Sequence, residues 1–337
     1  MAERGDAVVE IRDAVAEAPA WVARLVGQEA PLQRRWLNWL FDLEYWLLFR
    51  FPPVRGFITW LGTRIGGPVV QRLIDDADPD VVVSTYPGTT EVLGRLRRRG
   101  RVHVPVVSAV TDLAALRLWA SSGVDLHLIT HPESEPEVRA IAPQSRIVAA
   151  RGMTSPEFDD PVDQAEARAV LELPANGGIV IVSGGGWGVG DMAGAITAAL
   201  AVEGVAAVVV LCGRSDALKT RLAGRFGREP RVQLWGFTAR MSELMAAADV
   251  LVHSTAGLTV LEAWIRGCRA ISYGWGVAHI RLNNQAYRRF GIADVAPDRA
   301  SLRAALERAL ALPRTPHPEY GQQPTAANEI LALVNHR

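Results

Sequence analysis

Short runs of apolar, mostly β-branched residues alternate with helical patterns along most of this chain. In the first half these runs lie at Val8–Ile11, Val81–Ser84, Val104–Ala109, Leu126–Thr130 and Ile147–Ala149. In the second half they lie at Ile179–Ser183, Ala207–Leu211, Val232–Leu234, Val250–His253 and Ala270–Tyr273. Helical patterns fill the intervals, for example Ala193–Ala201, Ala239–Ala247, Thr259–Arg266 and Arg299–Leu312. Apolar strands separated by helices are typical of parallel sheets, so the chain is predicted to be an α/β protein.

The chain has 337 residues, enough for two sheets that each bury their own core. Arg151–Pro161 interrupts the alternation with a glycine, two prolines and acidic residues, and we expect the join there. The prediction is therefore a first domain over residues 1–157 and a second over residues 158–337. The last helix is a candidate to pack back on the first domain.

Composition excludes some classes of function. The 36 basic and 36 acidic residues give a formal net charge of zero, which argues against a nucleic-acid partner. Cys212 and Cys268 lie in apolar segments, which indicates buried thiols in a reducing cytoplasm, and no Cys/His spacing predicts a metal site. No apolar run reaches the roughly 20 residues that a bilayer span requires, so any membrane contact is predicted to be peripheral.

One segment, Pro31–Asp75, departs from the α/β alternation. It is aromatic and apolar with interleaved arginines, and Pro52-Pro53 divides it into two expected helices. Tryptophan favours the headgroup level of a bilayer and arginine favours anionic lipids, so this segment could rest on the inner leaflet. A pair of core helices that covers the first sheet explains the pattern equally well. The candidate membrane and acceptor contacts are Trp36, Trp39, Trp46 and Arg50.

The sharpest local motif is the glycine-rich stretch Ser183–Asp191, which follows a predicted strand and precedes a helix. Glycines allow backbone N–H groups to approach a diphosphate closely, and the helix N-terminus adds partial positive charge. A flexible strand-to-helix turn without a ligand is the alternative. The motif is not a Walker loop, because no Gly-Lys-Ser/Thr follows it.

A second small turn, Thr255–Thr259, starts a helix after the strand Val250–His253. Open α/β sheets bind ligands at such carboxyl ends of strands. Glu262 is expected on the first turn of that helix, where its carboxylate could accept hydrogen bonds from two ribose hydroxyls. A partner of the helix dipole is an equally good interpretation of Glu262.

The order of these motifs resembles one group of glycosyltransferases. A glycine-rich turn, Gly236-Phe237, a helix, AADVLV, a small-Gly-x-Thr-x-x-Glu turn and an Asn/Gln-rich segment follow one another between Gly177 and Leu312. That group contains the peptidoglycan lipid-linked GlcNAc transferase and the monogalactosyl- and glucosyl-diacylglycerol synthases. In the first half, DPDVVVSTYP, PVVSAVTDL and RIVAARGMTSPEF resemble the acceptor domain of the lipid-glycosylating branch.

The resemblance implies a GT-B fold, in which two Rossmann-like doubly wound domains face a cleft. It also implies an inverting, metal-independent transfer of a hexose or GlcNAc from a UDP-sugar to a membrane lipid such as diacylglycerol. The UDP-sugar is then a co-substrate and no cofactor is needed. Such an enzyme would be cytoplasmic and peripherally bound to the membrane. Transfer to a soluble acceptor, or UDP-sugar binding without full catalysis, are the alternatives.

Carried over position by position, the resemblance implies a donor site. Gly185 and Gly186, with Trp187 beside them, would cradle the diphosphate, and Phe237 would lie beside the uracil. Gly257, Leu258 and Thr259 would line the nucleotide pocket, with Glu262 on the ribose. The residues expected to approach the sugar hydroxyls are His279, Asn283, Asn284 and Gln285, for which a capped surface helix is the alternative.

The first half departs from the family pattern at two places. The family's first strand, with its glycine-rich, histidine-bearing loop, has no counterpart before AVVEIRD. Leu116 stands where the lipid-glycosylating relatives usually place a histidine. Asp112 remains as the candidate base for the acceptor hydroxyl, because a carboxylate at a strand end can take that proton. An N-cap of the following helix is the alternative role for Asp112.

Overall fold

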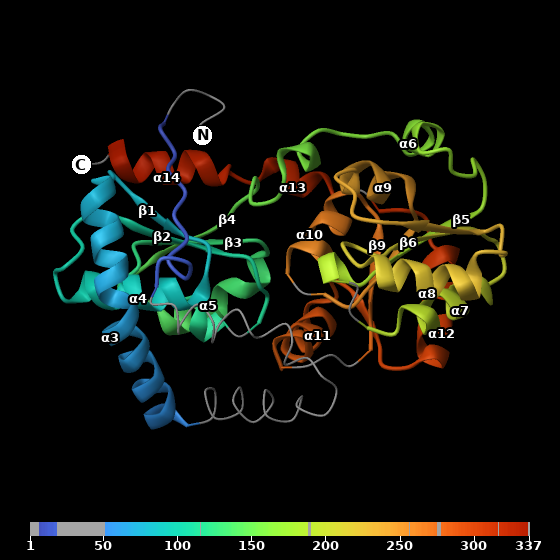
Figure 1. The fold of residues 1–337 in the computed structure, drawn as a ribbon. Helices are drawn as coiled ribbons and strands as arrows, with labels where there is room; N and C mark the ends of the chain where they lie inside the picture. Colours follow the sequence, from blue (N-terminus) through green and yellow to red (C-terminus); the bar gives the residue numbers. More distant parts are fainter. Residues whose placement is uncertain are drawn as a thin grey trace. The chain divides into compact units, whose positions relative to one another are not determined.

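The computed structural model describes residues 7–18, 51–114, 116–187, 190–255, 257–274, 278–315 and 317–335. They fall into two compact units (Figure 1). Unit 1 comprises the chain up to Met153 together with the segment from Gln323 onward, and unit 2 is Thr154–Gln322. Trp36, Trp39, Trp46 and Arg50 lie outside the described residues.

Unit 1 contains a parallel sheet with the strand order β1-β2-β3-β4. The strands are β1 Val82–Ser84, β2 Val106–Val110, β3 Leu126–Ile129 and β4 Arg146–Ala149. The described helices are α3 Pro52–Ala77, α4 Pro87–Arg98, α5 Glu135–Ile141 and α14 Ala326–Asn335, with one-turn 3-10 helices at Leu116–Leu118 and Pro132–Ser134.

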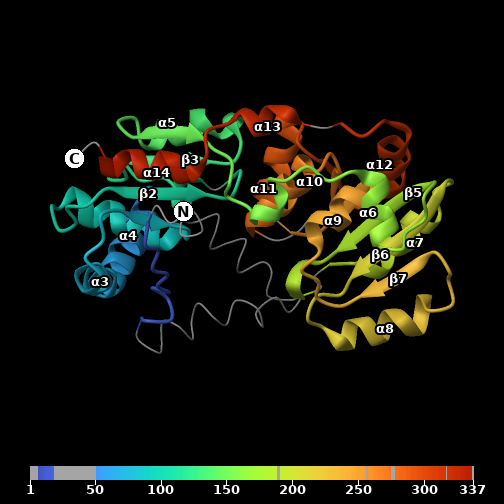
Figure 2. The same ribbon diagram turned by 90° about the horizontal axis from the view of Figure 1, so that it is seen from above.

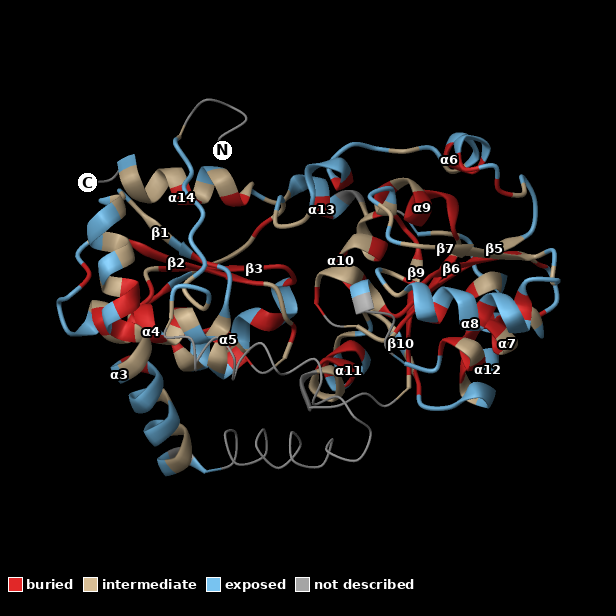
Figure 3. Cartoon of the chain, viewed as in Figure 1, coloured by how far each residue is buried: buried red, intermediate tan, exposed pale blue. Residues whose placement is uncertain are grey.

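Helices cover both faces of this sheet. Ala326 and Ile330 of α14 pack on Val107, Leu126 and Leu128, so the chain's last described helix lies along β2 and β3 (Figure 2). On the other face, α4 packs on β2 and is covered in turn by the second half of α3. The central strands β2 and β3, between these layers, are buried (Figure 3).

Unit 2 contains a larger parallel sheet with the order β10-β9-β8-β5-β6-β7. Its strands are β5 Gly178–Ser183, β6 Val205–Leu211, β7 Val232–Trp235, β8 Val250–His253, β9 Arg269–Tyr273 and β10 Asp294–Ala296. Its helices are α6 Gln164–Val170, α7 Met192–Leu200, α8 Asp216–Phe226, α9 Met241–Ala247, α10 Leu258–Ile265, α11 Ala278–Phe290, α12 Arg299–Ala311 and α13 Pro318–Gln322, with 3-10 turns at Pro156–Phe158 and Gly185–Trp187.

The winding of this second sheet reverses beside β5. The chain runs outward from β5 to β7 and then returns to place β8 on the other side of β5. As a result α7 and α12 pack together on one face, whereas α6 and α9 pack together on the other (Figures 1 and 2). Loops diverge at such a reversal, so the carboxyl ends of β5 and β8 form a natural ligand site.

Two arginines, the half-buried Arg314 and the buried Arg266, complete the helix ends of unit 2. Arg314 donates to the carbonyl oxygens of Ala246 and Ala248 at the end of α9, and to that of Arg266 after α10. Arg266 in turn donates to Ser242 and to the carbonyl oxygen of Glu157. The last carbonyls of a helix have no partner within it, so these guanidinium groups supply the missing donors.

Two sequence predictions differ from the structure. Val8–Ile11 is not a strand. Val8 and Ile11 are 101% and 90% exposed, so their apolar side chains are not buried against other apolar residues. The edge strand β10 was not predicted, because three residues of AspValAla are too short to show a period. Among the described residues, no helix is long and apolar enough to cross a membrane.

Candidate functional site

The glycine loop after β5 contacts the turn after β8 so closely that side chains do not fit between them. Gly185 has a φ of +68°, and a Cβ atom placed on it would lie 2.9 Å from Cγ2 of Thr255. Gly190 has a φ of +100°, and its Cβ would lie 2.5 Å from Oγ of Ser254. Both positions require glycine, because the backbone there has a positive φ and because a Cβ atom would clash with the neighbouring turn. No side chain therefore covers the backbone of the loop at these two positions.

A third loop, between β6 and α8, joins this pair. A Cβ on Gly213 would lie 2.5 Å from the carbonyl oxygen of Gly186, and the backbone N–H of Arg214 donates to that same oxygen at 3.0 Å. Gly186 itself is exposed, and among the described residues outside its two chain neighbours no atom lies within 4 Å of its Cβ position. Three loops therefore meet at the carboxyl ends of β5, β6 and β8, with an open face at Gly186.

The turn after β8 places Glu262 differently from the sequence prediction. Gly257 has a φ of 64°, and α10 begins directly after it at Leu258, one residue earlier than predicted. The first turn of α10 holds no acidic residue, because Glu262 lies on the second turn. The interpretation of Glu262 as a first-turn partner of the helix dipole is therefore wrong. Leu258 and Thr259 are half-buried in the first turn.

Glu262 is half-buried, and its carboxyl group has an unusual pKa. Burial raises the pKa of Glu262 to about 7. The structure shows no hydrogen bond or ion pair from its carboxylate to any described residue. A carboxylate in this state gains most from hydroxyl donors that arrive with a ligand, because they replace the water that it lost.

His253, at the end of β8, supports the same turn and was not singled out in the sequence. Its Nδ1 accepts a hydrogen bond from the backbone N–H of Thr255 at 3.3 Å and lies 3.2 Å from Oγ1 of that residue. The ring is 1% exposed and meets Tyr287 edge-on at 6.0 Å between centroids. Burial lowers the pKa of His253 to about 4, so the ring is neutral and Nδ1 acts as the acceptor.

The amide cluster of α11 divides between core and surface. Asn283 and Asn284 are 0% and 1% exposed, so the surface-helix interpretation is wrong for both. Asn284 accepts from Ser272 at 2.6 Å and thereby ties α11 to β9. Gln285 is exposed, and the described structure of His279 is limited to its backbone in α11. Gln285 is thus the exposed one of the three amides, and the contact of this cluster with a sugar stays a prediction.

Phe237, the expected neighbour of the uracil, lies after β7 and is 63% exposed. The guanidinium carbon of Arg214 lies 4.8 Å from the centre of its ring. Of the predicted Trp187, only the backbone in the 3-10 turn is described. An exposed aromatic ring beside the open glycine loop is suited to stacking on a planar base.

In unit 1, Asp112 follows β2 at its carboxyl end. It is half-buried, and its Oδ2 accepts a hydrogen bond from the indole N–H of Trp119 at 3.2 Å. Only a 3-10 turn, Leu116–Leu118, follows it in place of the expected α-helix. Leu116 is fully buried among Trp119 and the apolar residues of β2 and β3, so this position is part of the core.

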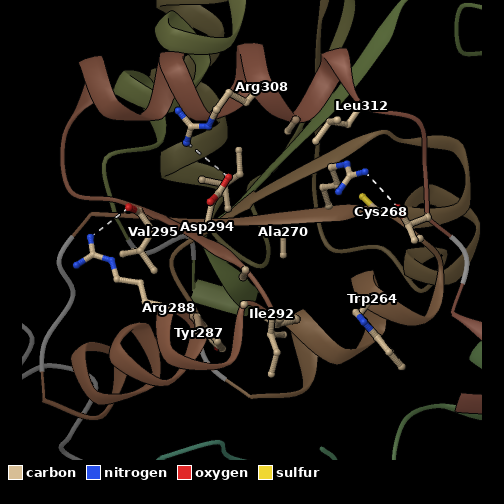
Figure 4. Close-up of a pocket in the computed structure, with 18 of the residues that line it drawn as sticks. Trp264, Cys268, Ala270, Tyr287, Arg288, Ile292, Asp294, Val295, Arg308 and Leu312 are labelled. Atoms are coloured by element: carbon tan, nitrogen blue, oxygen red, sulfur yellow. Dashed lines mark hydrogen bonds and ion pairs between the residues drawn. The ribbon is translucent and has the colours of Figure 1, made fainter. Parts of the chain in front are cut away.

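A cavity in the described parts of unit 2 lies elsewhere (Figure 4). It has a volume of about 680 Å³ and lies where β9 and β10 begin and α11 and α12 end. Cys268, Asp294 and Arg308 line it, and Arg308 lies 3.8 Å from Asp294. This is the opposite end of the strands from the glycine loops, so it is not the predicted donor site.

Comparison with known proteins supports the resemblance. A family model described as monogalactosyldiacylglycerol (MGDG) synthase matches residues 62–152, which lie in unit 1. The resemblance predicted from the sequence is confirmed. A processive diacylglycerol beta-glucosyltransferase of Staphylococcus aureus (strain Newman) is 25% identical over 197 residues, 58% of this chain and 50% of that protein. The chain spans about half the length of the curated relatives that it matches.

Solved structures confirm the fold. MurG of Acinetobacter baumannii superposes with a TM-score of 0.51 at 16% identity, over 80% of this chain and 77% of that chain. A protein assigned as a UDP-N-acetylglucosamine 2-epimerase of Listeria monocytogenes gives the same TM-score at 12% identity, over 80% and 77% of the two chains. The predicted α/β class with two parallel-sheet domains, the GT-B architecture, is thus confirmed. A transferase and an epimerase share it, so the reaction must be argued from the site.

Proposed function

We propose that this chain is an inverting glycosyltransferase that moves a hexose or GlcNAc from a UDP-sugar to the hydroxyl group of a membrane lipid such as diacylglycerol. The observation that carries the proposal is the close contact, at the carboxyl ends of adjacent strands β5 and β8, between the glycine loop and the turn that starts α10, the helix that carries Glu262. The MGDG synthase match and the similarity to a diacylglycerol glucosyltransferase support the lipid acceptor.

In this proposal unit 2 holds the donor. The open backbone at Gly186 faces the diphosphate, Phe237 stacks on the uracil and Glu262 accepts from the two ribose hydroxyls. The acceptor oxygen forms its bond to the anomeric carbon as the bond from that carbon to the diphosphate breaks. Glycine-loop N–H groups stabilise the charge that moves onto the departing UDP.

Asp112 of unit 1 is the proposed base. The acceptor proton passes to its carboxylate, and the indole of Trp119 fixes the orientation of that carboxylate through Oδ2. Among the described residues, no group of three or more His, Cys, Asp or Glu side chains is arranged to hold a metal ion. The proposed step uses only the carboxylate and the donor-site dipoles.

The first half of α3 is the proposed membrane contact within the described residues. Phe57, Ile58, Trp60 and Leu61 are 39–61% exposed, and Phe57 stacks on Trp60. Arg64 follows them on the same helix and is exposed. By contrast Val69 and Val70, in the second half, are buried. An apolar surface beside a cation is suited to the headgroup region of an anionic membrane.

A donor and acceptor panel tests this function. UDP release is measured with UDP-glucose, UDP-galactose and UDP-GlcNAc, each with diacylglycerol vesicles and with a soluble alcohol. Vesicle-dependent release that Asp112→Asn abolishes while leaving UDP binding intact supports the proposal. Release with the soluble alcohol alone points to a small-molecule acceptor. UDP binding without release from any donor rejects the transferase.

A further inference from the structure

Arg214 is the charged side chain that the donor-site prediction leaves unused. It follows β6 on the third of the three converging loops, and its backbone N–H is fixed on the carbonyl oxygen of Gly186. Gly213 holds the two loops in contact, since no side chain fits there. The anchoring of Arg214 at the glycine loop is therefore built into the backbone.

The side chain of Arg214 is exposed and has spare donors. It lies over the Phe237 ring, with 4.8 Å between the guanidinium carbon and the ring centre, and it forms no hydrogen bond with another described side chain. It forms no ion pair with any acid that the structure describes. A guanidinium group carries five N–H donors, and none of these is engaged by a described acceptor. An exposed cation–π contact is weak compared with a bidentate contact to phosphate oxygens.

Two other arginines near these loops are already paired. Arg299 lies 3.9 Å from Asp191, whose carboxylate also accepts from Tyr273. Arg240, after β7, pairs with Glu243. Arg214 thus combines an anchor on the glycine loop with an unpaired positive charge.

The chemistry of the proposed reaction requires such a charge. When the bond between the anomeric carbon and the diphosphate oxygen breaks, its electron pair stays on that oxygen, and UDP leaves with one more negative charge. Backbone N–H groups share only partial charges with it. A guanidinium group adds a full positive charge with planar, paired donors.

We infer that Arg214 binds the diphosphate of the donor, leaving the Phe237 ring to the base when the nucleotide arrives. This inference rests on the proposed function and names a residue of the same site. In the ligand-free protein Arg214 covers one face of the ring. In the complex it turns to the phosphate oxygens beside Gly186, and the planar base takes its place on the ring.

A ligand series separates the two contacts. Binding of UDP, UMP and uridine is measured by calorimetry for the wild-type chain and for Arg214→Gln. Loss of a charge-assisted contact is expected to weaken UDP binding about 10- to 100-fold, with a smaller effect on UMP. Uridine binding is expected to change less than about threefold. Arg214→Lys keeps the charge without the paired donors and should fall between the two.

Arg225→Gln is the matched control, because Arg225 also lies over an aromatic ring, 5.0 Å from the centre of Phe226 on α8. It should bind all three ligands as the wild type does. Equal weakening of uridine and UDP in Arg214→Gln, or unchanged UDP binding, overturns the inference while the proposed function stands. No binding of UDP by the wild type overturns both.

Discussion

Gly185 lies so close to Thr255 that a single methyl group cannot be added between the loops after β5 and β8. At its neighbour Gly186, a Cβ atom would meet no atom of the described residues outside its two chain neighbours. The two glycines therefore give a matched pair of variants, one that tests the fold of the site and one that tests its ligand.

We expect Gly185→Ala to lower the free energy of unfolding of unit 2 by about 1–2 kcal/mol, because the left-handed backbone and the Thr255 contact both oppose a Cβ atom. Gly186→Ala should leave thermal unfolding unchanged but weaken UDP binding at least tenfold, since its methyl group points into the open face. Thermal melts and calorimetry check both. Normal UDP binding by Gly186→Ala would exclude the diphosphate from this loop.

Glu262 predicts a pH dependence of nucleotide affinity. Its pKa of about 7 means that part of the population is protonated at neutral pH, whereas ribose hydroxyls donate best to the ionised form. UDP affinity should rise several-fold between pH 6 and 8, with proton release on binding. Glu262→Gln should bind more weakly at pH 8 and show no such rise. Calorimetry in two buffers of different ionisation enthalpy measures the released proton.

The same carboxyl group predicts a pH dependence of stability. Burial raises its pKa above its ordinary value of 4.5, so its stabilising contribution is complete below that value and is lost as pH rises through 7. Glu262→Gln should therefore match the wild type at pH 4.5 and exceed it by about 1–3 kcal/mol at pH 8. Urea melts at the two pH values give the comparison. A constant difference would place the pKa near its ordinary value.

His253 predicts a pH dependence of stability in the opposite direction to that of Glu262. Its pKa is lowered from 6.5 to about 4, so its contribution is present above 6.5 and is lost as pH falls through 4. His253→Asn keeps an acceptor for the N–H of Thr255 but cannot titrate. Between pH 6.5 and 4 the variant should lose less stability than the wild type, by about 3 kcal/mol at most. His127, buried in β3 with a pKa of about 4, leaves a similar slope in both proteins.

The exposed part of α3 predicts membrane binding. Phe57→Ser combined with Trp60→Ser should reduce co-sedimentation with anionic vesicles at least fivefold without lowering the melting temperature, because both side chains are exposed. Ile11→Ser, which alters an exposed apolar residue elsewhere in unit 1, is the control. Equal co-sedimentation of all three proteins would remove α3 from the membrane contact.

The strands of both sheets were predictable because parallel strands are apolar on both faces. Val250–His253 was predicted with its exact bounds, and the other central strands within one or two residues. The three residues of β10 are too few to show the apolar pattern of a strand. Val8–Ile11 shows that pattern but does not form a strand. The pattern of apolar residues in a sequence shows which side chains are able to be buried. It does not show whether the fold provides a neighbouring surface that buries them.

The site was predictable where glycine or a small turn carries the chemistry. Gly185 and Gly257 both have the positive φ that only glycine adopts readily. Side-chain direction was less accessible, since Asn284 faces Ser272 in the core and Gln285, its neighbour, faces solvent. Arg214 was missed because an exposed arginine after a strand has no local pattern, and only the fold places it on the glycine loop.

The bridge between Arg151 and Thr325 has a consequence for synthesis. The two chain segments that leave and re-enter unit 1 pair there, and Arg151 bonds to a residue 172 positions away. Translation therefore finishes all of unit 2 before α14 exists. Until α14 is synthesised, Val107, Leu126 and Leu128 are not covered by its apolar side chains. Synthesis of unit 1 therefore begins before that of unit 2 but is completed after it. A nascent chain stalled before Gln323 should expose that apolar sheet face to chaperones.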